Sequence, residues 1–178
     1  MPSGLKWADR NVRATSPYDQ GPFFQWGNVV GQPFGCNARI FDQGWYESHC
    51  AAASFTTDLP VGDEYDMARF NMGTPWRMPT RADALELFAN TDQEFVFVNG
   101  VYCSKLMKKT DHSIYILLPE TDYYNLDSVK SYSTGYGSRL FYYFTSTAAD
   151  AQNAYIFRAT GVTANIKFCG YGVRGVCD

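Results

Sequence analysis

The chain has 178 residues, of which 46% are hydrophobic and 19% charged, a composition that predicts one globular domain, spanning residues 1–178, with a sizeable core. The formal net charge is −3 and no long basic run occurs, so binding to nucleic acid through its phosphates is not expected. No apolar run approaches the length of a membrane span, and the opening Met1-Pro2-Ser3-Gly4 lacks the features of a signal peptide. The chain opens in mid-pattern, which favours a domain excised from a longer protein.

The first third of the chain predicts one strand and little other regular structure. Residues 4–12 read as a strand. Ser16 and Pro17 suit the cap and the first position of a short helix, which Gly21-Pro22 would end. Residues 31–62 have weak periodicity and contain several glycines and prolines, so we expect an irregular excursion there.

Two helical signals follow in the middle of the chain. Residues 66–71 predict a helical turn. Thr80 is followed three residues later by the carboxylate of Asp83, which is the spacing of a capping box. An apolar face then continues the expected helix to about Asn90.

The second half of the chain is predicted to be mostly β. Asn99-Gly100 lies between two apolar runs and is a strong signal for a two-residue hairpin. Further strands are predicted at residues 113–118, 139–145, 154–159, 164–169 and 172–176. Helices early and strands late indicate an α+β domain with two short-to-medium helices and a mostly antiparallel sheet. The predicted core residues are Trp7, Trp26, Trp76, Leu85, Phe88, Ile116 and Tyr155.

The segment from Tyr123 to Phe144 has the composition of a binding surface. Six tyrosines lie there among serines, glycines and asparagine. Tyrosine offers a large amphipathic contact area at a low entropy cost, and the small polar residues supply adaptable hydrogen bonds. The alternative is a long surface loop whose tyrosine rings lie on the core with their hydroxyl groups in water.

Motifs spread over nearly the whole chain resemble a known domain family. The central run Trp76-Arg77-Met78-Pro79-Thr80 is the most specific of them. The opening Gly4-Leu5-Lys6-Trp7-Ala8 and the closing Gly172-Val173-Arg174 occur in the matching order. These motifs resemble the Bacteroidetes-type Fibrobacter succinogenes major paralogous domain family. That family has a C-type-lectin-like fold and is similar to the variable proteins of diversity-generating retroelements and to phage receptor-binding adhesins.

The resemblance implies that the first and last strands pair and that a Tyr-rich face in the C-terminal half binds ligand. This face combines the 123–139 loop with outward positions on the last strands. The residues assigned to it are Tyr123, Tyr124, Asn125, Tyr132, Tyr136, Arg139, Tyr143, Asn153, Arg158, Asn165 and Lys167.

Signals for catalysis or metal binding are weak. The Glu-Pro-Asn or Gln-Pro-Asp loops and the Trp-Asn-Asp motif of calcium-dependent sugar lectins do not occur, and the acidic residues at 58–66 do not have EF-hand spacing. His49 and His112 are the two histidines, and neither lies in a pattern that pairs a base with a nucleophile. Cys169 and Cys177 are the closest pair of cysteines in the sequence, and they form either a disulfide or free thiols.

These observations favour a non-enzymatic recognition module with no catalytic residues, no metal and no cofactor. Its expected partner is a cell-surface protein or glycan, and the resemblance places it in a phage tail, as part of the virion, or on a bacterial cell surface. Phage adhesins of this fold tend to be trimers, so the resemblance also implies a homotrimer within a fibre. Two alternatives stay open: a copper oxidase of the formylglycine-generating type, which shares the broad fold, and a structural domain of a bacterial surface protein.

Overall fold

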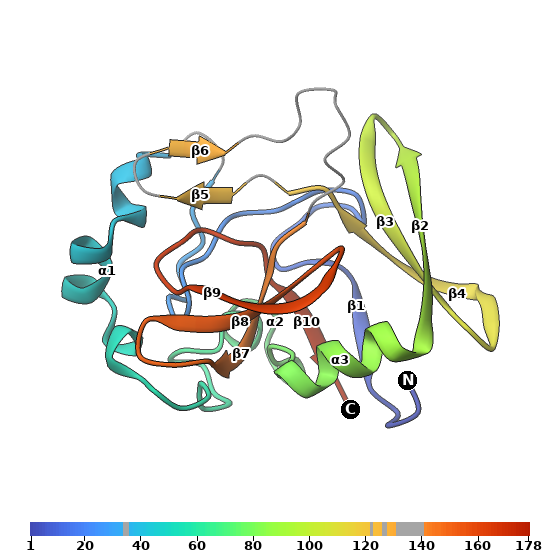
Figure 1. The fold of residues 1–178 in the computed structure, drawn as a ribbon, viewed down its shortest axis with the longest axis horizontal. Helices are drawn as coiled ribbons and strands as arrows, with labels where there is room; N and C mark the ends of the chain where they lie inside the picture. Colours follow the sequence, from blue (N-terminus) through green and yellow to red (C-terminus); the bar gives the residue numbers. More distant parts are fainter. Residues whose placement is uncertain (34–35, 122, 126–127, 131–140) are drawn as a thin grey trace.

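The structure, a computed structural model, describes residues 1–33, 36–121, 123–125, 128–130 and 141–178, with only the backbone of 123–125 and 128–130 (Figure 1). Its helices are α1 (Gln43–His49), α2 (Met67–Met72) and α3 (Arg81–Asn90), and two 3₁₀ turns are η1 (Ala38–Phe41) and η2 (Ala51–Ser54). Its strands are β1 (Lys6–Asn11), β2 (Thr91–Val98), β3 (Val101–Lys108), β4 (Asp111–Pro119), β5 (Tyr123–Asn125), β6 (Ser128–Lys130), β7 (Tyr143–Ala148), β8 (Asn153–Arg158), β9 (Gly161–Ile166) and β10 (Arg174–Cys177).

The strands form four small antiparallel sheets, β1-β10, β2-β3-β4, β5-β6 and β7-β8-β9, within the part of the chain that the structure describes. Together with the helices this confirms the predicted α+β class. None of the helices among the described residues is both long enough and apolar enough to cross a membrane.

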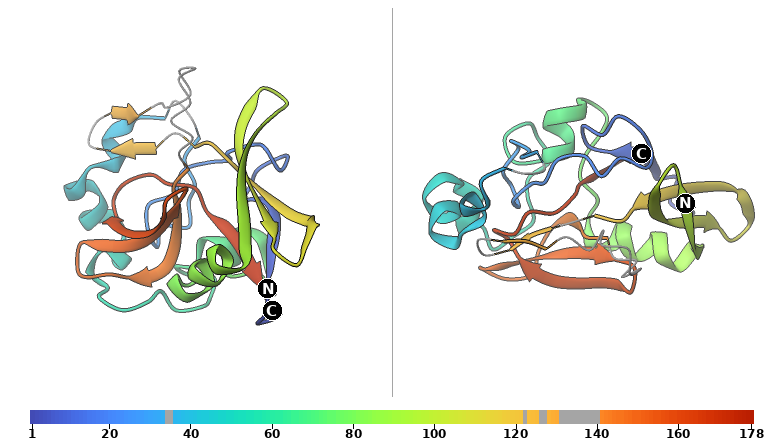
Figure 2. Two further views of the ribbon diagram at one scale, coloured as in Figure 1. Left: turned by 45° about the vertical axis from the view of Figure 1, so that its right-hand side comes forward. Right: turned by 90° about the horizontal axis from the view of Figure 1, so that it is seen from above.

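The two ends of the chain lie together, as predicted. Strand β1 pairs with β10 in a register that sets Lys6 opposite Cys177 and Trp7 opposite Val176. The pairing continues where Val12 N donates to the Val173 carbonyl at 2.9 Å. Both termini therefore emerge at one end of the molecule, whereas the turn between β2 and β3 and the short strands β5 and β6 lie at the other end (Figures 1 and 2).

The predicted hairpin at Asn99-Gly100 is present and joins β2 to β3. Both turn residues have positive φ, 48° at Asn99 and 85° at Gly100, and the ladder closes with Val98 opposite Val101. Positive φ at both central positions is the geometry that matches the twist of a two-residue hairpin, and Asn-Gly tolerates it best. The hairpin extends away from the body of the domain (Figure 2).

Helix α3 begins at the predicted capping box. The Thr80 side chain accepts a hydrogen bond from Asp83 N at 3.1 Å, and the Asp83 carboxylate accepts one from Thr80 N at 2.8 Å. The prediction that Leu85 is a core residue is wrong, because its side chain is 45% exposed. Ala84 and Leu87 occupy the buried stripe of this helix, and Leu85 lies on its outer side.

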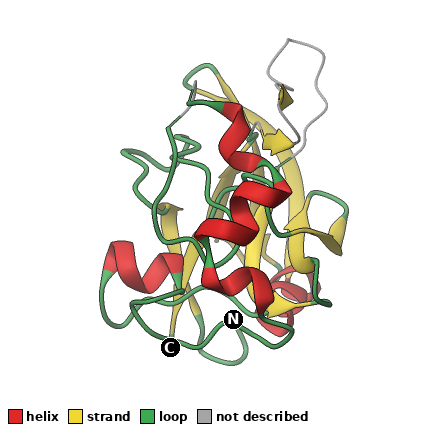
Figure 3. Cartoon of the chain, turned by 90° about the vertical axis from the view of Figure 1, so that its left-hand side faces the viewer, coloured by secondary structure: helices red, strands yellow, loops and turns green. Residues whose placement is uncertain are grey.

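The helices along the opposite flank differ from the prediction. The structure has no helix at 16–19; instead the Asp19 carboxylate accepts hydrogen bonds from Thr15 N and Gly21 N and closes a local turn. The excursion at 31–62, expected to be irregular, contains η1, α1 and η2, which Figure 3 shows from their own side. A hydrogen bond to a residue outside the helix anchors α1 to the domain, because the Tyr46 hydroxyl donates to the Trp26 carbonyl at 2.6 Å.

The core lies on both faces of the β7-β8-β9 sheet. Ile156 belongs to the larger cluster, with Trp26 and Phe144, whereas the next residue, Phe157, belongs to a second cluster beneath α3. Of the other predicted core residues, Trp26 is fully buried, as expected. Five more are partly buried at the margins of the core: Trp7, Trp76, Phe88, Ile116 and Tyr155.

Candidate functional site

The Tyr-rich segment coincides largely with the residues that the structure leaves undescribed. Tyr132, Tyr136 and Arg139 lie outside the described residues. Tyr123, Tyr124 and Asn125 form β5, which pairs with β6 and lies beside η1, and of these three residues only the backbone is described. Their assignment to the binding face therefore stays a prediction.

The prediction that Tyr143 faces a ligand is wrong. Its side chain is fully buried and stacks on Phe157 with ring centroids 5.2 Å apart. The hydroxyl accepts a hydrogen bond from Asn11 Nδ2 at 2.9 Å and donates one to the Pro119 carbonyl at 3.2 Å. Burial raises the pKa of this hydroxyl to about 12. Tyr143 joins β1, β4 and β7 inside the domain.

Lys167 is also buried rather than outward-facing, so its assignment to the binding face is wrong. Its Nζ donates to the backbone carbonyls of Phe55, Asp150 and Ala151 and lies 4.6 Å from the centre of the Trp26 ring. Burial lowers the pKa of this amine. One cation thus binds carbonyl groups of two loop segments, one at Phe55 and one at Asp150-Ala151, which is a structural role.

The remaining three strand residues of the predicted face are partly buried. Asn153 holds the β7–β8 turn, because its Nδ2 donates to both carboxylate oxygens of Asp150 at 3.0 Å. Asn165 Oδ1 accepts from the backbone N–H of Ile166 at 2.8 Å. Arg158 lies at the end of β8, opposite Gly161, and its side chain forms no hydrogen bond or ion pair with any described residue. Of these three positions, Arg158 is the one whose side chain is not engaged by a described residue, and the assignments of Asn153 and Asn165 to the binding face stay predictions.

Residues 122–140 are flanked by a buried stem, which we define as Thr121, Phe141 and Tyr142. The side chains of Thr121 and Phe141 are 1% exposed, and Tyr142 N donates to Thr121 Oγ1 at 3.0 Å. The described residues on either side of 122–140 are therefore held at one place by buried contacts.

An exposed aromatic cluster, which we call the hairpin patch, lies beside this stem. It consists of Phe95, Phe97 and Tyr102, which are 39%, 62% and 39% exposed. Phe97 and Tyr102 are cross-strand partners with ring centroids 4.6 Å apart. Phe95 and Tyr102 border the same small depression as Phe141 of the stem. Large aromatic side chains that remain exposed together are typical of contact surfaces.

The hairpin patch did not enter the predicted site, although the sequence contains a signal for it. The run Phe95-Val96-Phe97-Val98 is apolar at every position, so both faces of this strand carry apolar side chains. A two-stranded projection cannot bury both faces against one core, and therefore one of them stays exposed.

The candidate groups for catalysis are dispersed. His112 Nε2 lies 2.8 Å from Asp92 Oδ2 on the exposed side of β4. His49 stacks on Trp45 at the end of α1, and its Nδ1 lies 2.8 Å from Ser48 Oγ. Among the described residues, no carboxylate orients His49.

The cysteine pair considered for copper does not form a disulfide, since Cys169 and Cys177 are both thiols. Burial raises the pKa of the Cys169 thiol to about 11. The described residues also contain no group of three or more His, Cys, Asp or Glu side chains that could hold a metal ion.

Comparisons of the chain with protein-family models, with curated proteins and with solved structures each found no significant match.

Proposed function

We propose that this protein is a non-enzymatic recognition module with a C-type-lectin-like fold, and that it binds a cell-surface protein or glycan. The contact surface consists of the hairpin patch, the Tyr-rich segment at 122–140 and Arg158. As in the phage adhesins and retroelement-diversified proteins that its motifs resemble, the module presents this surface at the end of a larger virion-tail or bacterial surface protein.

One observation carries the proposal: a Tyr-rich segment starts from a rigid stem that lies beside exposed aromatic rings. The stem fixes where the segment begins and ends, and Phe97 and Tyr102 provide aromatic contact area next to it. Buried aromatic anchors supply most of the affinity in many interfaces. The paired termini emerge at the opposite end of the domain, so attachment to a larger protein leaves this surface accessible (Figure 1).

The test measures saturable binding of the labelled domain to a panel of intact bacterial cells. Two variants remove parts of the surface: Phe97→Ser with Tyr102→Ser, and Tyr132→Ala with Tyr136→Ala and Arg139→Ala. The matched control is Phe70→Ser on α2, where an aromatic ring is 53% exposed away from the hairpin. We expect each surface variant to weaken binding by about thirtyfold or more, which corresponds to one hot spot of about 2 kcal/mol, and the control to bind normally.

Treatment of the cells separates the two ligand classes. Loss of binding after protease treatment identifies a protein ligand, and loss after periodate oxidation identifies a glycan. Binding that both surface variants leave unchanged would overturn the proposal. Stoichiometric copper that is lost in Cys169→Ser or Cys177→Ser would replace it with the oxidase of the formylglycine-generating type.

A further inference from the structure

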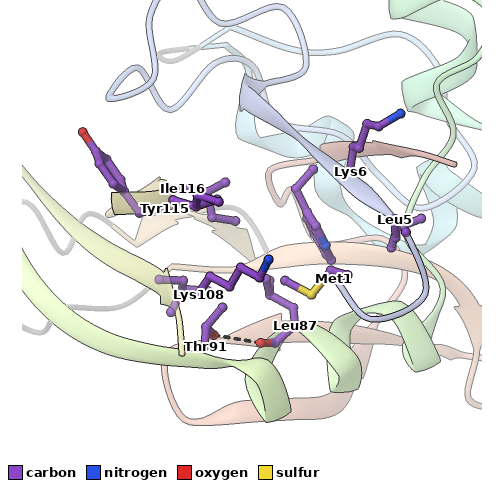
Figure 4. A pocket seen from close by; sticks show the side chains of 12 residues that line it. Met1, Leu5, Lys6, Leu87, Thr91, Lys108, Tyr115 and Ile116 are labelled. Atoms are coloured by element: carbon purple, nitrogen blue, oxygen red, sulfur yellow. Dashed lines mark hydrogen bonds between the residues drawn. The ribbon is translucent and has the colours of Figure 1, made fainter. Parts of the chain in front are cut away.

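A second candidate site lies near the termini, far from the hairpin patch. It is a pocket of about 370 Å³ between β1, the end of α3 and strands β3 and β4 (Figure 4). Known small-molecule sites begin at about this size. At about 30 Å³ for each water-sized group, the pocket accommodates on the order of ten non-hydrogen atoms.

The lining is largely apolar, and of its two lysines one, Lys108, is directed across it. Leu87, Leu106 and Ile116 contribute aliphatic surface. Figure 4 shows the Lys108 side chain reaching from β3 toward Met1, whereas the amine of Lys6 points away from the other lining residues. The lining contains no carboxylate.

The charge of Lys108 is not neutralised within the pocket. Lys108 forms no ion pair with any described residue. The nearest carboxylate is that of Asp111, the first residue of β4, whose Oδ1 accepts hydrogen bonds from Ser113 N and Oγ at 3.0 and 2.6 Å. These hydrogen bonds are the main cause of the lowered pKa of Asp111, and the charge of Lys108 makes a smaller contribution. The Thr91 hydroxyl is also committed, because it donates to the Leu87 carbonyl at 2.7 Å. Of the two lysines of the lining, Lys108 is therefore the one whose charge can meet a ligand in the pocket.

The wall formed by Trp7 contains an unsatisfied donor. Its indole Nε1 is buried and has no hydrogen-bond partner among the described residues. A buried donor without an acceptor is destabilising, and such a group in a folded protein calls for an explanation. An acceptor delivered by a ligand, with a small displacement of the neighbouring side chains, would satisfy it.

We propose that this pocket binds a small carboxylate with an apolar body, of about the size of a medium-chain fatty acid. The aliphatic wall takes the apolar body, and Lys108 and the Trp7 indole N–H take the carboxylate. Apolar lining with a few convergent polar groups is the usual construction of a small-molecule site. The inference is independent of the recognition surface at the other end of the domain.

The probe is sodium octanoate, followed by the indole ¹H–¹⁵N signals of the four tryptophans in a nuclear magnetic resonance titration. Trp7→Phe assigns the Trp7 signal. We expect this signal to shift saturably with octanoate and to respond much less to 1-octanol, which has the same chain without the charge.

Two lysine variants provide the critical comparison. Lys108→Met should weaken octanoate binding about threefold to tenfold, the range expected for one partly buried ion pair, and should leave octanol binding unchanged. Lys6→Met removes the same charge from a lysine whose amine points elsewhere, and it should change the affinity less than about twofold by the same reasoning. The proposal is overturned if octanoate produces no saturable shift, if octanol binds equally well, or if the two lysine variants behave alike.

Discussion

Replacing Lys167 by methionine tests whether this residue stabilises the fold or contacts a ligand. The wild-type amine donates to three backbone carbonyls, two of them at 2.9 and 3.0 Å, and lies over the Trp26 ring. Each carbonyl left without a donor costs about 1–3 kcal/mol when it is buried. Two effects reduce this cost. The hydrogen bonds to the loop carbonyls are only part-buried, so water can reach these carbonyls. Methionine also carries no charge, so the variant no longer has to desolvate an ammonium group on folding. We expect a net loss of about 2–4 kcal/mol in the free energy of unfolding.

Equilibrium unfolding in urea measures this loss, with Lys105→Met as the control. Lys105 forms an ion pair with Glu94 at 2.9 Å on the surface of the β2–β3 hairpin. An exposed ion pair contributes at most about 1 kcal/mol. If Lys167→Met is no more destabilising than this control, the structural role of Lys167 is refuted and an outward position becomes the better interpretation.

Three further predictions concern the stability of the fold. Burial alone would raise the pKa of the Asp83 carboxyl, but the hydrogen bonds from Arg77 and Thr80 outweigh it, so the folded pKa lies below the ordinary value. Asp83→Asn should therefore cost about 1 kcal/mol at neutral pH, and in urea titrations the difference should shrink as the pH falls below about 4 and disappear below the folded pKa. Gly100→Val should cost about 1–2 kcal/mol, because a β-branched residue is strained at a φ of 85°; calorimetry that finds no loss would contradict the turn geometry. Trp26→Phe leaves the Thr145 carbonyl without its 2.9 Å donor, and thermal unfolding should show a loss of about 2–4 kcal/mol.

The features predicted correctly from the sequence are those that neighbouring residues determine. Asn99-Gly100 defines its own turn, and Thr80 with Asp83 satisfies its own helix start. The errors concern elements whose structure depends on contacts between residues far apart in the sequence. Helix α1 is short and depends on Tyr46 bonding to a carbonyl twenty residues earlier, which no local pattern reveals.

The errors in the predicted site have a similar cause. Alternation of polar and apolar residues along a strand identifies the outward face only if one face of the sheet is buried and the other is exposed. The β7-β8-β9 sheet is covered on both faces, so consecutive residues such as Ile156 and Phe157 are both inside, and Tyr143 is enclosed with them. The cluster of exposed aromatic rings that forms the hairpin patch lies on the β2–β3 hairpin instead, because that hairpin projects beyond the core.

The pairing of β1 with β10 determines how the domain responds to mechanical load. The two strands are antiparallel and their outer ends coincide at Lys6 and Cys177. A force that separates the two ends of the chain therefore opens the ladder one hydrogen bond at a time. A force between the hairpin end of the domain and one terminus acts along the strands and loads several hydrogen bonds together. A domain that is tethered at one terminus and pulled at its hairpin end should therefore withstand a larger force than a domain whose two termini are pulled apart.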